Sequence, residues 1–153
     1  MNATFEELLA RDGVLVYKIR GVSMEPMLRQ NRDLVTIRVP ASRLKKYDVA
    51  LYKRGDSYVL HRVIGVADDH YLICGDNTYV LEHVPDSAVI GVLTAFKRKG
   101  REHSVTEPGY QLYARLWHTI HPLRVLLVCR RLAVRAARKT GLLPIIKKLL
   151  GRE

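Results

Sequence analysis

Hydrophobic and polar residues alternate over short stretches in the first two thirds of this 153-residue chain, a pattern typical of β-strands. Turn sequences such as Asn31-Arg32-Asp33 and Arg54-Gly55-Asp56 separate the stretches. The predicted strands cover residues 14–20, 34–39, 48–52, 58–66, 71–74, 89–96 and 103–106. Because no helices alternate with them, we expect a mainly β fold, built as an antiparallel sheet or a partly closed barrel.

Helical patterns flank these strands on both sides. Thr4 can cap a short helix through Ala10 that ends at Gly13. From Pro108 onward, apolar residues recur at helical spacing up to Pro122, and two further apolar and basic segments cover residues 122–141 and 142–150. We therefore expect a β domain over residues 1–107 and a helical extension over residues 108–153.

The formal net charge of +11 is concentrated in this extension. Residues 1–110 hold 16 basic and 14 acidic side chains, whereas residues 111–153 hold 10 and one. Two interpretations stay open: helices that pack on the sheet with solvated basic faces, or a peripheral membrane contact through residues 111–153. A nucleic-acid partner is disfavoured because no nucleic-acid-binding motif accompanies the charge.

Location and metal content are constrained by what the sequence lacks. No stretch approaches the roughly 18 apolar residues of a membrane-spanning helix, and the acidic amino terminus does not resemble a signal peptide. We expect a cytoplasmic protein or one bound peripherally to a membrane. Cys74 and Cys129 lie far apart without metal-ligand spacing, so no metal is predicted.

The segment Gly21-Val22-Ser23-Met24-Glu25-Pro26-Met27-Leu28 is the first candidate for chemistry. Glycine and proline around a serine predict a sharp turn that exposes a hydroxyl between two strands. Such a hydroxyl is a useful nucleophile only if a nearby base accepts its proton. Taken alone, the segment fits equally well a loop serine beside a core methionine.

Two later motifs change that balance. Leu60-His61-Arg62-Val63-Ile64 places a histidine in a strand, and Gly75-Asp76-Asn77 places a carboxylate after the next strand. In this order, the three motifs resemble those of the type I signal peptidase group of serine peptidases over residues 17–92. A histidine at the position of His61 is typical of the branch of this group found in the endoplasmic reticulum, archaea and some bacteria. The bacterial lysine-type branch has a lysine at that position.

The resemblance implies a serine endopeptidase in which Ser23 attacks a peptide bond and His61 is the general base. Asp76 is expected to orient His61, with Glu82 and then Asp86 as alternatives. The backbone N–H of Ser23 would stabilise the oxyanion.

The same resemblance implies that Met24 and Pro26 shape the floor of the substrate site. The substrate would be an extended segment of a precursor protein or peptide, with small residues before the cleaved bond. No metal or organic cofactor is implied. The alternative is a catalytically inactive member of the same fold that binds peptides or membranes.

Overall fold

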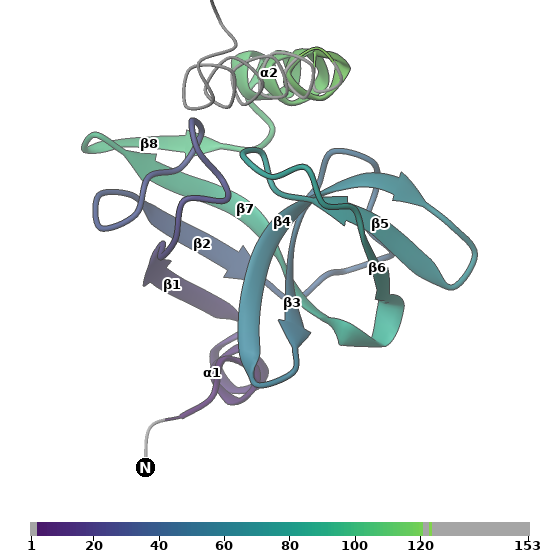
Figure 1. Ribbon diagram of the computed structural model, residues 1–153. Coiled ribbons are helices and arrows are strands. Elements are labelled where there is room, and N and C mark those ends of the chain that lie inside the picture. Colours follow the sequence, from purple (N-terminus) through teal and green to yellow (C-terminus); the bar gives the residue numbers. More distant parts are fainter. Residues whose placement is uncertain (1–2, 121–122, 124–153) are drawn as a thin grey trace, which may run out of the picture. The chain divides into compact units, whose positions relative to one another are not determined.

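The computed structural model describes residues 3–120 and residue 123, and their fold is mainly β, as predicted. Within these residues, eight strands, one 3₁₀ turn and two helices follow one another (Figure 1). In order they are α1 (Phe5–Asp12), β1 (Val14–Lys18), β2 (Leu34–Arg38), β3 (Val49–Arg54), β4 (Ser57–Val66), β5 (His70–Cys74), β6 (Glu82–Pro85), η1 (Asp86–Ala88), β7 (Val89–Arg98), β8 (Arg101–Ser104) and α2 (Pro108–Thr119).

The eight strands form one antiparallel sheet, which curves but does not close (Figure 1). Its strand order is β1-β2-β7-β3-β4-β5-β6, and β8 pairs with β7 outside this path. Strand β4 pairs with β3 from Ser57 to Arg62 but with β5 only from Arg62 onward. Within the described residues, the other edge of residues 57–61 therefore has no strand partner, and neither does the outer edge of β1.

The long strand β7 joins the two halves of the sheet. Its beginning pairs with β3 and the remainder with β2, and a register shift interrupts both ladders. Gly91 lies where these halves meet, and a Cβ atom there would come within 2.4 Å of Ile37 Cγ2. Only glycine allows the strands this close an approach.

The core consists of two clusters of buried apolar side chains on the curved sheet. The larger one joins α1, the early strands and the loop after β1, and it includes Leu9, Met24, Met27, Leu28, Val35, Ile37, Leu51 and Leu93. The smaller one joins β3, β4, β5 and β6, and it includes Tyr52, Val63, Tyr71, Ile73 and Val84.

The predicted amino-terminal helix is confirmed. Thr4 and Glu7 form a reciprocal capping box at its start, and Gly13 ends it with a left-handed φ of 68°. The four-residue strand β6 was not predicted, because Glu82-His83-Val84-Pro85 contains only one buried apolar residue and ends in proline.

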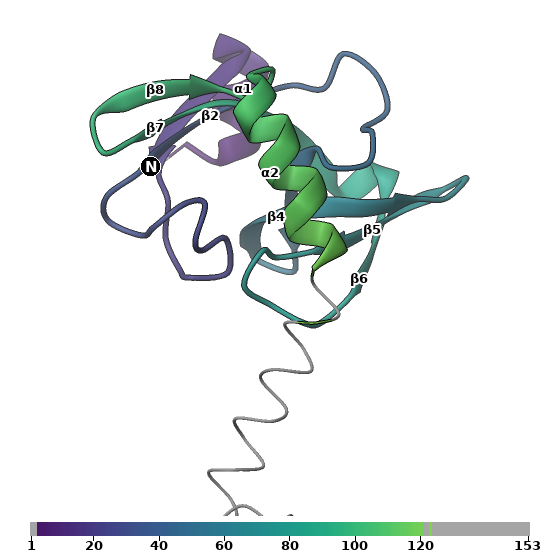
Figure 2. The same cartoon turned by 90° about the horizontal axis from the view of Figure 1, so that it is seen from above.

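The boundary of the β domain lies further along the chain than predicted. The first compact unit covers residues 1–118, so α2 belongs to it and not to a separate extension. Helix α2 lies over the sheet (Figure 2). Its residues Tyr110 and Ala114 are buried, and Tyr110 is part of the larger core cluster. The predicted helical segments after residue 122 lie outside the described residues.

Candidate functional site

Ser23 lies in the loop between β1 and β2, and its side chain is partly exposed. Gly21 has a φ of 79°, which favours glycine and starts the turn. Met24, Met27 and Leu28 follow with at most 2% exposure and anchor the loop in the core. The sequence thus holds the backbone on both sides of the serine and leaves its hydroxyl at the surface.

His61 lies on β4 and is only 5% exposed. Its Nδ1 atom is 3.1 Å from Oε1 of Glu82 on β6 and 3.3 Å from the hydroxyl of Tyr52 on β3. Arg54 Nη1 lies 3.1 Å from the other carboxylate oxygen of Glu82. The contact with Glu82 favours the tautomer with a proton on Nδ1, which leaves Nε2 as the basic nitrogen.

Ser23 and His61 both line one pocket with a volume of about 520 Å³. Its wall also includes Glu82, residues of β1 and the following loop, and the first half of β4. Among the described residues, no hydrogen bond joins the Ser23 hydroxyl to the imidazole. Catalytic hydrogen bonds are often longer in unliganded sites, so the shared pocket is compatible with a serine–histidine pair.

The surroundings of His61 favour a neutral imidazole. Burial lowers its pKa below the ordinary value, and the nearby Glu82 carboxylate opposes this without reversing it. For Glu82, burial works in the direction of a higher pKa, but contacts with Tyr52, Arg54 and His61 outweigh it and hold the pKa below the ordinary value. At neutral pH the site therefore combines a neutral base with an ionised carboxylate.

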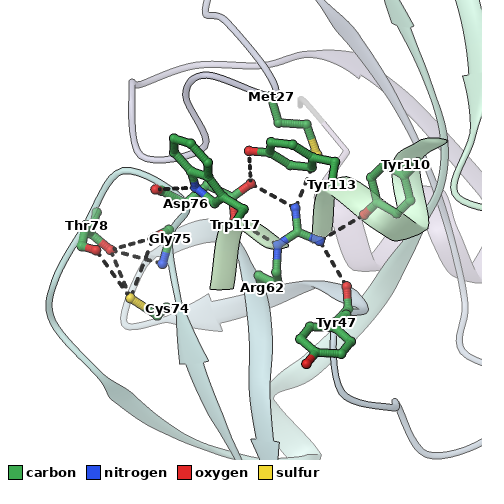
Figure 3. Close-up of polar contacts among 10 residues, drawn as sticks. All are labelled: Met27, Tyr47, Arg62, Cys74, Gly75, Asp76, Thr78, Tyr110, Tyr113 and Trp117. Carbon is green, nitrogen blue, oxygen red and sulfur yellow. Dashed lines mark hydrogen bonds and ion pairs between the residues drawn. The ribbon is translucent and has the colours of Figure 1, made fainter. Parts of the chain in front are cut away.

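The prediction that Asp76 orients His61 is wrong, because the Asp76 carboxylate is bound to Arg62. Arg62 Nε and Nη2 donate to the two oxygens of Asp76, each at 2.8 Å, and both side chains are 2% exposed (Figure 3). Burial alone would lower the pKa of Arg62, but Asp76 raises it above the ordinary value. Glu82, the first alternative to Asp76 from the sequence, is the carboxylate beside His61.

This buried ion pair also holds α2 on the sheet. Tyr110 accepts a hydrogen bond from Arg62, and Tyr113 donates one to the Asp76 carboxylate, each at 3.1 Å. Trp117 Nε1 donates to the main-chain oxygen of Asp76 at 2.9 Å, so three aromatic residues of α2 converge on the pair (Figure 3). Asp76 is therefore a structural centre of this region.

The neighbours of Asp76 hold the nucleophile loop. The Asn77 main-chain N–H donates to the Ser23 carbonyl oxygen at 2.7 Å. The side-chain amide of Asn77 donates to the Val22 carbonyl oxygen at 3.2 Å. A Cβ atom on Gly75 would lie 2.8 Å from the Ser23 carbonyl oxygen and 3.1 Å from His61 Cδ2, so glycine permits this close packing. The Gly75-Asp76-Asn77 motif thus connects the serine loop, the histidine strand and α2.

Contacts of Val22 orient the peptide group that joins Val22 to Ser23. The carbonyl oxygen of this group accepts from the Asn77 side chain at 3.2 Å and from the Glu25 N–H at 3.1 Å, while its N–H, that of Ser23, has no acceptor within residues 3–120. An unpaired N–H next to the hydroxyl is available to bind an oxyanion.

The other two predicted site residues do not line this pocket. Met24 is 1% exposed and belongs to the core, where it anchors the loop that carries Ser23. Pro26 is partly buried and is also absent from the pocket wall. The floor is made instead by residues that the motifs do not include, among them Tyr17, Ile19, Tyr58 and Leu60.

Sequence reasoning also missed Tyr52 and Arg62. Tyr52 ends a continuous buried run at the start of β3, and Arg62 directly follows the candidate histidine. An arginine within the apolar run Leu60–Ile64 was the available signal, because such a residue must be paired when it is buried.

Comparison with known proteins does not identify a family: no family model matches the chain, and no curated protein matches it significantly. Within the part of the chain that the structure describes, no helix has the length and apolar character needed to cross a bilayer.

Proposed function

We propose that this protein is a serine endopeptidase of the signal-peptidase type that cleaves an extended segment of a precursor protein or peptide. The observation that carries the proposal is the pocket shared by Ser23 and His61, with the far ring nitrogen of His61 bound to Glu82 at 3.1 Å. A nucleophile, a base and an acid that orients the base are the parts that acyl transfer needs.

In the first half of the reaction, His61 Nε2 accepts the proton of the Ser23 hydroxyl as its oxygen attacks the scissile carbonyl carbon. The Ser23 N–H binds the oxygen of the tetrahedral intermediate. The imidazolium gives its proton to the leaving amine as the C–N bond breaks, which leaves an acyl ester on Ser23. Glu82 stabilises the imidazolium and fixes the ring.

The second half repeats these steps with water. His61 takes a proton from the water that attacks the ester, and it returns that proton to the Ser23 oxygen as the acid product leaves. Because burial keeps the pKa of His61 low, the base is unprotonated at the start of each half at neutral pH.

An extended substrate suits the two free strand edges beside this pocket. Both β1 and residues 58–61 of β4 contribute to its wall, and each has an edge without a strand partner in the described part of the chain. A peptide can add to such an edge through main-chain hydrogen bonds.

The test is covalent labelling of the full chain by an acylating probe directed at active-site serines. We expect labelling of the native protein and none of Ser23→Ala or His61→Ala. Ser42→Ala is the matched control, because Ser42 is an exposed serine in the loop between β2 and β3 and lines neither the Ser23 pocket nor the pocket beside it. It should label at the native rate.

Labelling that persists in Ser23→Ala would refute the assignment of the nucleophile. If folded native protein resists a series of such probes, including in the presence of anionic vesicles, the catalytically inactive alternative replaces the proposal. The missing hydrogen bond between Ser23 and His61 is the observation that favours this alternative.

A peripheral membrane contact through residues 111–153 stays part of the proposal. It is supported by the charge of this segment and by Leu112 and Leu116, which lie one turn apart on α2 and are 58% and 54% exposed. Co-sedimentation with anionic vesicles should fall in a Leu112→Ser/Leu116→Ser variant. Equal sedimentation of the variant and the native protein would show that these leucines do not contribute.

A further inference from the structure

A second pocket continues the Ser23 pocket along β1. Its volume is about 620 Å³, and both pockets have Tyr17, Arg20 and Tyr58 in their walls. Together they form a groove between β1 and the first half of β4, with Ser23 near one end and Phe5 at the other. We call this the β1–β4 groove.

Two cations of the groove, Lys18 and Arg20, have no acidic partner among the described residues. Lys18 and Arg20 lie two residues apart, so in an extended chain their side chains point to the same side. Both are exposed, and neither has a hydrogen bond or ion pair within the described residues. Their charges are available to a ligand.

Two acidic side chains at the groove are already compensated. Glu6 accepts a hydrogen bond from Tyr58 and lies 3.2 Å from Lys53 Nζ. Glu82 contacts His61 and Arg54. The groove is therefore left with unpaired positive charge on the β1 side.

We infer that the β1–β4 groove selects extended peptides that carry an aspartate or glutamate where the chain passes Lys18 and Arg20. This inference rests on the proposed function, since it assigns the substrate class of the same site. Arg20 lines both pockets and Lys18 only the second, so an acidic residue bound by Lys18 lies away from the cleaved bond. Each exposed pair of opposite charges should change affinity by at most about fivefold.

The experiment measures binding without cleavage. Full-length Ser23→Ala protein is immobilised and incubated with a synthetic library of randomised peptides of about 12 residues, and the retained peptides are sequenced by mass spectrometry. We expect acidic residues to be enriched about two- to fivefold over the input, with the enrichment falling at high salt.

The protein is basic overall, so a control of equal charge is required. Arg20→Glu, made in the Ser23→Ala background, should abolish the enrichment. Arg101→Glu changes the net charge equally, but Arg101 is an exposed residue of β8 that lines neither pocket, and the enrichment should persist.

Three outcomes would overturn the inference: no peptide is retained, acidic residues are not enriched, or both variants lose the enrichment equally. Because the assay needs no catalysis, its result is separate from that of serine labelling. Acid selection without labelling would leave a peptide-binding groove and remove the peptidase. Labelling without acid selection would support the peptidase and remove the inferred preference for acidic peptides.

Discussion

The buried pair of Arg62 and Asp76 allows a sharp separation of structural and catalytic roles. Asp76→Asn keeps the size of the side chain but removes its charge. Arg62 would then be a buried cation without a carboxylate, and two of its N–H groups would face an amide in place of two charged oxygens. Glu82→Gln makes the same chemical change at the carboxylate beside His61.

The burial of the two carboxylates predicts different costs. Removing one partner of a fully buried ion pair typically costs about 3–5 kcal/mol of unfolding free energy. In a chain of this length that corresponds to a fall in melting temperature of roughly 10–15 °C. Glu82 is 18% exposed and its partner Arg54 is 60% exposed, so loss of that contact should cost no more than about 1 kcal/mol.

Thermal and urea unfolding of the native chain and both variants would measure this difference. A double variant, Arg62→Leu/Asp76→Leu, is the control, because removing both charges should cost less than leaving Arg62 alone. The assignment of a structural role to Asp76 is refuted if the free energy of unfolding of Asp76→Asn lies within about 1 kcal/mol of the native value. It is also refuted if Glu82→Gln is the less stable variant.

Three further predictions concern the site itself. Glu82→Gln should slow acylation of Ser23 by at least about 10²-fold without unfolding the protein, which serine labelling over time would test; a native rate would exclude Glu82 as the orienting acid. The acylation rate should rise with pH as His61 loses its proton and should be half-maximal below pH 6.5, because burial lowers this pKa; a midpoint above 7 would contradict a buried neutral base. Gly75→Ala should abolish labelling and cost about 1–3 kcal/mol of stability, whereas the control Gly109→Ala, with no atom within 4 Å of its added Cβ, should do neither; equal behaviour of the two variants would refute the close packing at Gly75.

Local patterns in the sequence determined most of the secondary structure. The alternation of apolar and polar residues located seven of the eight strands within a few residues, and Thr4 with Gly13 defined the first helix. These signals act between neighbours along the chain, so they can be read without the fold. Strand β6 was not predicted, because a short strand that is held mainly by its pairing with β5 needs little apolar periodicity.

Ser23 and His61 were selected by the order of three short motifs, which resembles that of the signal peptidase group, since each motif taken alone also fits a structural role. The same motifs ranked Asp76 ahead of Glu82, which lies six residues further along the chain. Pairing of β5 with β6 brings Glu82 to His61, while Asp76 faces Arg62 and α2. That choice depends on contacts between distant segments, so only the tertiary structure decides it.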